Sequence, residues 1–128
     1  MGRPLRYSVL DGRFAVCRLA PDSPVPEWAM KPRFLSVTRT PEELSIVCAE
    51  RDIPPDVQAQ AGWACLQFEG PFPFEMTGVL ASILNPLADA KVGIFAISTY
   101  DTDYVLIQAD QLAAADEALR LAGHERVR

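Results

Sequence analysis

The stretch that decides the fold is Gly78-Val-Leu-Ala-Ser-Ile-Leu-Asn-Pro-Leu-Ala-Asp-Ala-Lys-Val-Gly-Ile-Phe-Ala-Ile-Ser-Thr-Tyr-Asp-Thr-Asp-Tyr-Val-Leu-Ile107. Within residues 75–90 the apolar side chains recur at the spacing of one helix face, which predicts an amphipathic helix. Pro86 lies inside this helix, and we expect a kink there because proline has no N–H and its ring displaces the carbonyl of Ser82. Two strand-like runs follow, 93–98 and 104–108, and a polar turn separates them.

The sequence on both sides of this stretch completes a unit of six elements. A strand is predicted over 63–68, a second helix over 113–121, and a short edge strand over 125–128. The order β-α-β-β-α-β is that of the ferredoxin-like fold. In the first half, strand-like runs are predicted over the ranges 5–10, 14–19, 34–38 and 44–49. The first two of these runs are joined by Asp11-Gly12, which is typical of a hairpin.

An internal repeat relates the two halves when the chain is shifted by 61 residues. The shift places Phe34 on Phe95, Thr38 on Thr99, Glu42 on Asp103, Leu44 on Val105 and Ile46 on Ile107. We therefore expect an α+β protein with two ferredoxin-like lobes side by side, 1–60 and 61–128, the first degenerate with shortened helices. Neither lobe alone would bury a sufficient core.

Composition limits the classes of function. The chain has 128 residues, of which 49% are hydrophobic, and a net charge of −5, which is typical of a globular protein and argues against nucleic acid as the main partner. Its longest uncharged run, 76–88, is shorter than the roughly 20 residues of a membrane span. No apolar segment follows the first arginines, so we expect no secretory leader and a cytoplasmic protein.

Catalytic chemistry has little support in the sequence. Cys17, Cys48 and Cys65 each lie in an apolar run without a CxxC motif or a nearby histidine, which predicts buried, unreactive thiols. The single histidine, His124, is expected at the surface near the end of the chain. With no nucleophile–base pair and no metal cluster, the sequence predicts no catalytic residue, no metal ligand and no cofactor.

The start Thr77-Gly-Val-Leu80, the strand Gly93-Ile-Phe-Ala-Ile-Ser-Thr99 and the turn Tyr100-Asp-Thr-Asp-Tyr104 together resemble the ACT domain. More narrowly, the chain is similar to small tandem ACT proteins related to the regulatory domains of aspartate kinase and to the CASTOR-type amino-acid sensors. The resemblance implies a non-catalytic regulatory protein that holds an amino acid between ACT lobes. It also implies a homodimer, and an effector protein that the sequence does not identify.

An amino acid brings one carboxylate and one ammonium, so its site needs anion donors close to a carboxylate. Residues 77–78 open the helix, where free backbone N–H groups and the positive end of the dipole favour an anion. Gly78 has no Cβ and would let the ligand approach the backbone. The resemblance assigns Asp103 to the ammonium or to a basic side chain of the ligand. The expected ligand-binding residues are Thr77, Gly78, Val79, Leu80, Ile97, Ser98, Thr99, Tyr100 and Asp103.

Several alternatives stay open at this point. Thr77 could simply cap the helix, the polar residues of the turn could bond locally, and Tyr100 could be ordinary packing. A structural or protein-interaction dimer with a decayed ligand site competes with the sensor, whereas an enzyme has the weakest support. The first lobe has Glu42 in place of Asp103 and no Thr-Gly helix start, so we expect it to have lost its own site. Selectivity for a particular amino acid is not predictable from these residues.

Overall fold

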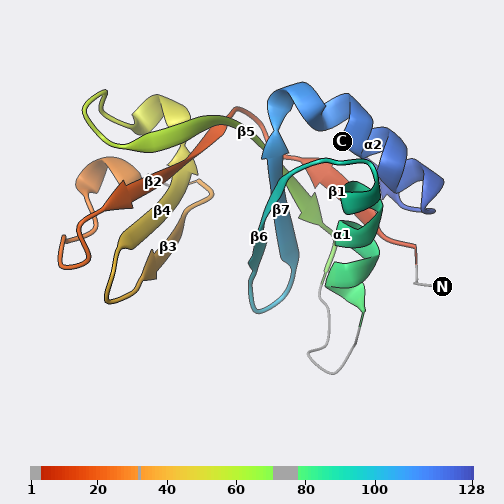
Figure 1. The fold of residues 1–128 in the computed structure, drawn as a ribbon, viewed down its shortest axis with the longest axis horizontal. Coiled ribbons are helices and arrows are strands. Elements are labelled where there is room, and N and C mark those ends of the chain that lie inside the picture. The colour runs from red at the N-terminus through yellow and green to blue at the C-terminus, as the bar shows by residue number, and fades with distance from the viewer. Residues whose placement is uncertain (1–3, 32, 71–77) are drawn as a thin grey trace. The chain divides into compact units, whose positions relative to one another are not determined.

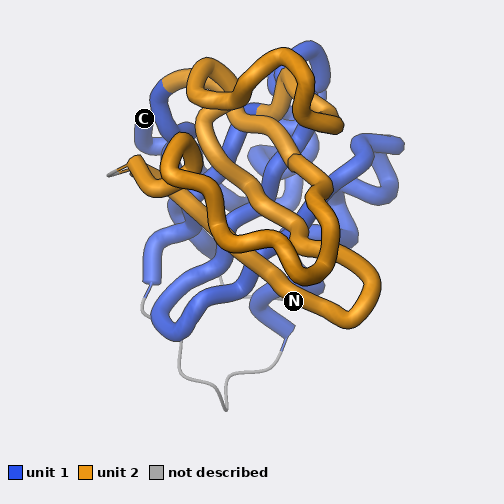
Figure 2. The backbone as a smooth tube through the Cα atoms, turned by 90° about the vertical axis from the view of Figure 1, so that its left-hand side faces the viewer, with its two compact units in different colours: residues 1–11, 64–128 blue, residues 12–63 orange. Residues whose placement is uncertain are grey.

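The computed structural model describes residues 4–31, 33–70 and 78–128 and has an α+β fold (Figure 1). The chain divides into two compact units, coloured separately in Figure 2. Unit 1 comprises residues 1–11 and 64–128, and unit 2 comprises residues 12–63. No helix of the described residues is long and apolar enough to cross a membrane.

Unit 2 is a small antiparallel sheet with reduced helices. Its strands are β2 (Phe14–Leu19), β3 (Ser36–Arg39), β4 (Leu44–Ala49) and the first part of β5 (Ala59–Phe68), in the order β3-β4-β2-β5. The 3₁₀ helices η1 (Glu27–Ala29) and η2 (Glu50–Asp52) occupy the chain positions of the two helices of a βαββαβ lobe. Both helices of this lobe are therefore shortened, as the sequence predicted.

Unit 1 contains the two α-helices of the described chain. Its strand order is β6-β7-β5-β1-β8, formed by β6 (Ile94–Ser98), β7 (Asp103–Gln108), the second part of β5, β1 (Arg6–Val9) and β8 (Glu125–Arg126). Helices α1 (Val79–Asp89) and α2 (Leu112–Leu121) pack on one face of this sheet, and the short 3₁₀ helix η3 (Ala109–Gln111) leads into α2. The ferredoxin-like prediction is confirmed, with an additional strand, β1.

The core of unit 1 follows the alternation of its strands. Every second residue of a strand points to the helix-covered face. That face and the helices contribute the buried residues Leu5, Tyr7, Ala64, Leu66, Phe68, Val105, Ile107, Ile83, Leu87, Ala115 and Leu119. The rings of Tyr7 and Phe68 stack at 5.1 Å, and the Tyr7 hydroxyl donates to Oδ1 of Asp116 at 2.6 Å. Strand β1 is thus built into this core.

The expected hairpin around Asp11-Gly12 is wrong. Strand β1 pairs with β5 in antiparallel fashion, Tyr7 opposite Phe68, and with β8 in parallel fashion, Tyr7 opposite Arg126. The predicted boundary at residue 60 places the run 5–10 in the first lobe, whereas the structure groups it with residues 64–128. The physical reason is burial, since β1 supplies side chains to the helix-covered face between β5 and β8.

The internal repeat lies at an offset of 59 residues rather than 61. With this offset the whole of β4 aligns with the whole of β7. The cross-strand partners Arg39 and Leu44 then align with the cross-strand partners Ser98 and Asp103. The equivalent of Asp103 is therefore Leu44, not Glu42. A slip of two residues preserves the alternation of a strand, so only the geometry of the turn separates the two offsets.

Candidate functional site

The turn between β6 and β7 is held together by its own threonines. The Thr99 N–H donates to the carbonyl oxygen of Thr102 at 2.9 Å, and the Thr102 N–H donates to Oγ1 of Thr99 at 3.3 Å. The Thr102 hydroxyl donates to the carbonyl oxygen of Phe68, at the end of β5. The Thr99 hydroxyl donates to the carbonyl oxygen of Thr102 at 3.0 Å, so local bonding accounts for this hydroxyl, one of the alternatives left open by the sequence.

Asp103 differs from the other residues of the turn because its side chain is buried. It begins β7 opposite Ser98, whose hydroxyl donates to Oδ1 of the carboxylate at 2.5 Å. Asp103 is only 9% exposed and shares its face of β7 with Val105 and Ile107, which belong to the core under the helices. A buried carboxylate is costly unless it is hydrogen-bonded or paired with a cation. Asp103 can therefore receive the positive group of a ligand.

The start of α1 can receive an anion. Gly78 precedes the helix with φ +79°, and none of the side chains in residues 4–31, 33–70 and 78–128 caps the helix there. The first bond of the helical ladder among the described residues runs from the Ser82 N–H to the Gly78 carbonyl at 2.9 Å. The backbone N–H groups of the first turn have no partner within the helix. In Figure 1 this helix start and the β6–β7 turn both lie at the lower end of unit 1.

The remaining predicted site residues are spread more widely. Val79 packs against the core of unit 1. Ile97 pairs with Tyr104, next to the pair Ser98 and Asp103. Because side chains alternate along a strand, the Ile97 side chain points to the other face of the sheet. Thr99 is exposed, and the Tyr100 side chain is 80% exposed. Leu80 is half-buried in the first turn of α1, and Thr77 lies outside the described residues. The structure brings together Ser98 and Asp103, and the ligand roles stay predictions.

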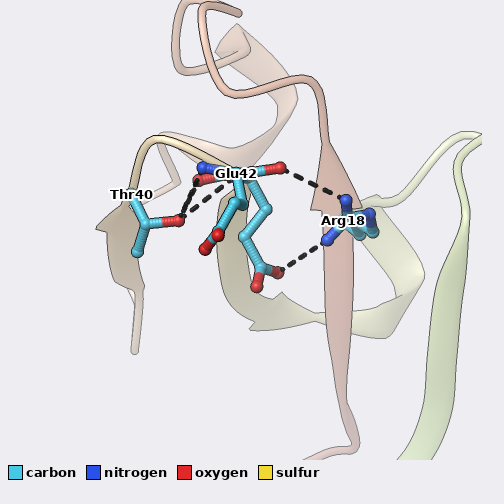
Figure 3. A network of polar contacts seen from close by, with 4 residues as sticks. Arg18, Thr40 and Glu42 are labelled. Atoms are coloured by element: carbon cyan, nitrogen blue, oxygen red, sulfur yellow. Dashed lines mark hydrogen bonds and ion pairs between the residues drawn. The ribbon is translucent and has the colours of Figure 1, made fainter.

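The corresponding turn of unit 2 is closed by an arginine (Figure 3). The Thr40 N–H donates to the Glu43 carbonyl at 2.9 Å, matching the bond from Thr99 to Thr102. Arg18 donates to the carbonyl oxygen of Glu42 at 3.2 Å and forms an ion pair with the Glu43 carboxylate at 3.3 Å. This turn carries no counterpart of Asp103, since Leu44 is buried at that position.

The other reactive groups are held in unreactive states. Burial raises the pKa of the Cys48 and Cys65 thiols to about 12, and it also raises the pKa of Cys17. Burial, followed by the hydrogen bond to Asp116, raises the pKa of the Tyr7 hydroxyl. Across residues 4–31, 33–70 and 78–128, no group of three or more histidine, cysteine or acidic side chains could hold a metal ion.

The fold and a match to a family model identify an ACT-domain protein. The family model described as "ACT domain" matches residues 58–120, and a second model, described as an N-terminal domain, matches residues 12–56. The chain belongs to the ACT-domain family, as its resemblance in sequence implied.

The chain is also similar to several known proteins. It is similar to the bovine "Cytosolic arginine sensor for mTORC1 subunit 1", with 29% identity over 98 residues, which cover 68% of this chain and 30% of the sensor. The chain spans about half the length of a human relative and a smaller share of the length of the arginine sensors. The structure of protein Atu0741 from Agrobacterium tumefaciens matches 98% of this chain and 94% of its own, with a TM-score of 0.93 and 38% identity. The ligand-free regulatory subunit of Thermus thermophilus aspartate kinase shares the fold, with a TM-score of 0.60, 16% identity, and 91% and 95% coverage.

Proposed function

We propose that this protein is a non-catalytic regulatory module that binds a free amino acid at the C-terminal ACT lobe. The observation that carries the proposal is the placement of a buried carboxylate, Asp103, at the end of unit 1 where α1 also starts after Gly78. The ammonium of the ligand would pair with Asp103. Its carboxylate would accept hydrogen bonds from the backbone N–H groups that follow Gly78.

The relatives support a regulatory role. One is named as an arginine sensor and another as the regulatory subunit of a kinase. The three cysteine thiols are buried, and burial raises the pKa of the Cys65 thiol, so these groups are poor nucleophiles. A homodimer whose second copy completes the site, and an effector protein that reads the bound state, are further parts of this proposal.

A thermal-shift screen of the twenty L-amino acids tests the proposal. A ligand that binds only the folded protein stabilises it by about 2.7 kcal/mol at 100 times its dissociation constant. One or a few amino acids should therefore raise the melting temperature, while the others serve as controls. If none does so at millimolar concentration, the binding proposal fails.

The competing role is an interaction dimer with a decayed site. The hydrogen bonds that join Thr99 to Thr102 favour it, because the Thr99 hydroxyl is already bonded within the turn. This reading predicts a stable dimer that ignores every amino acid in the screen. The screen therefore separates the two roles directly.

A further inference from the structure

The end of β5 touches the β6–β7 turn through a glycine. Gly70 lies two residues after the end of β5, and a methyl group built on it would overlap the carbonyl oxygen of Asp101. The same methyl would lie 3.1 Å from the carbonyl carbon of Asp101 and 3.2 Å from Cβ of Thr102. The backbone at Gly70 therefore packs directly on the turn, and any larger residue at this position would displace the turn.

A hydrogen bond makes the same connection independently. The Thr102 hydroxyl donates to the carbonyl oxygen of Phe68, a residue fully buried in the core of unit 1. Thr102 also closes the turn onto Thr99 through its backbone. Two contacts therefore fix the turn to the end of β5. One is the packing of the Gly70 backbone on the turn, and the other is the hydrogen bond from the Thr102 side chain.

We infer that Gly70 and Thr102 are positioning residues for the amino-acid site, because they fix the turn that places Asp103. The inference rests on the proposed function and adds two residues that were not among the predicted ligand contacts. Neither residue needs to touch the ligand. A charge-assisted hydrogen bond depends on the position of the carboxylate, so a shift of the turn weakens binding while the core stays intact.

Glycine substitutions test the backbone contact. The probe is an equimolar mixture of the twenty L-amino acids, titrated while the melting temperature is measured. Gly70→Ala should need roughly tenfold more of the mixture for the half-maximal shift, the loss expected when about one hydrogen bond is weakened. Gly93→Ala is the matched control, because a methyl at Gly93 meets open space and the residue starts the same hairpin. A wild-type titration curve for Gly70→Ala overturns the role of Gly70.

Threonine substitutions test the hydroxyl. Thr102→Val keeps the shape and removes the donor to Phe68, whereas Thr102→Ser keeps the donor. Weaker binding by Thr102→Val with rescue by Thr102→Ser supports the inference, since a purely steric role would not give this order. Equal titration curves for both variants and the wild type overturn it.

Hydrogen exchange tests the placement without a ligand. The Thr99 amide, which is bonded to Thr102, should exchange faster in Gly70→Ala and Thr102→Val and at the wild-type rate in Gly93→Ala. Unchanged exchange in the first two variants shows that they do not hold the turn, and the inference is then wrong. If the wild type ignores the mixture, the proposed function fails and the role in binding fails with it. The exchange rates then separately decide whether the two residues anchor the turn.

Discussion

His124 donates its Nε2–H to the carbonyl oxygen of Ser82 across 2.9 Å and so makes the bond that Pro86 cannot make. In a helix this carbonyl would accept the N–H of the residue four positions later, which here is a proline. The other ring nitrogen, Nδ1, accepts the Leu5 N–H at 3.0 Å, and these two contacts assign the neutral Nε2–H tautomer. His124 is only 5% exposed, so its expected surface position is wrong.

Removing this imidazole should destabilise unit 1. His124→Ala leaves the buried Leu5 N–H without a partner, at a cost of about 1–3 kcal/mol, and also removes the partner of the part-buried Ser82 carbonyl. Chemical denaturation gives the free energy of unfolding. Pro86→Ala restores an N–H to the helix, so the cost of His124→Ala should be smaller in that background. Equal costs in both backgrounds would show that Ser82 and His124 are not coupled.

The two aspartates around the β6–β7 turn should behave differently. Asp103→Asn keeps the shape and an acceptor for Ser98 but removes the charge, so it should weaken amino-acid binding roughly 10- to 150-fold. Asp101→Asn changes an exposed carboxylate and serves as the control, as does Glu42→Ala in unit 2. Thermal-shift titration with the responding amino acid measures all three. Loss of binding in Glu42→Ala alone would move the site to the first lobe.

Gly78 should be sensitive because of its backbone angle rather than its surroundings. Its φ is +79°, and a Cβ there would meet nothing within 4 Å. Gly78→Ala should therefore cost about 1–2 kcal/mol of stability, the penalty of a left-handed conformation for an L-residue, and Gly78→Asn should cost less. Denaturation curves give both values. If alanine is tolerated as well as asparagine, backbone strain is not what selects glycine.

Alkaline pH should destabilise the protein through its buried thiols. The pKa of Cys65 rises from its ordinary value of 9.0 to about 12 on burial, so the folded state keeps a proton that the unfolded state loses. This contribution is complete below pH 9 and is lost as the pH rises toward 12. Denaturation at pH 8 and pH 10 should show a smaller loss for Cys65→Ala than for the wild type. Rapid labelling of the native protein by a thiol reagent would contradict this burial.

A homodimer stays a prediction of the family resemblance. Light scattering at micromolar concentration should give about twice the chain mass of 14.1 kDa. The measurement should be made with and without the mixture of amino acids. A mass of one chain under both conditions would exclude the dimer.

The fold was predictable where a pattern is local. The helix stripe and the strand alternation located α1, β6 and β7 to within a few residues, because the core face repeats at fixed spacing. The pairing of β1 was not predictable, because Asp11-Gly12 indicates a turn but not the strand that β1 pairs with. The repeat offset failed for a similar reason, since two residues of slip leave the pattern of buried residues unchanged.

The candidate site was predictable in composition and not in arrangement. The turn and its acids stood out in the sequence, yet only the register shows that Ile97 points away from Asp103. Gly70 gave no signal beyond being a glycine beside a proline, because its contact with Asp101 joins segments far apart in the sequence. The buried role of His124 was hidden for the same reason, since Ser82 precedes it by 42 residues.

Because β1 lies between β5 and β8, it cannot complete its pairing until both of these strands have been synthesised. Residues 12–63 can form their own sheet as soon as they emerge, because the strands of unit 2 are close in sequence. Strand β1, in contrast, can pair only after β5 and then β8 have been synthesised. The Leu5 N–H, just before β1, donates to His124, which is 119 residues further along the chain. We expect unit 1 to close only after β8 has been synthesised, with β1 unpaired until β5 is available.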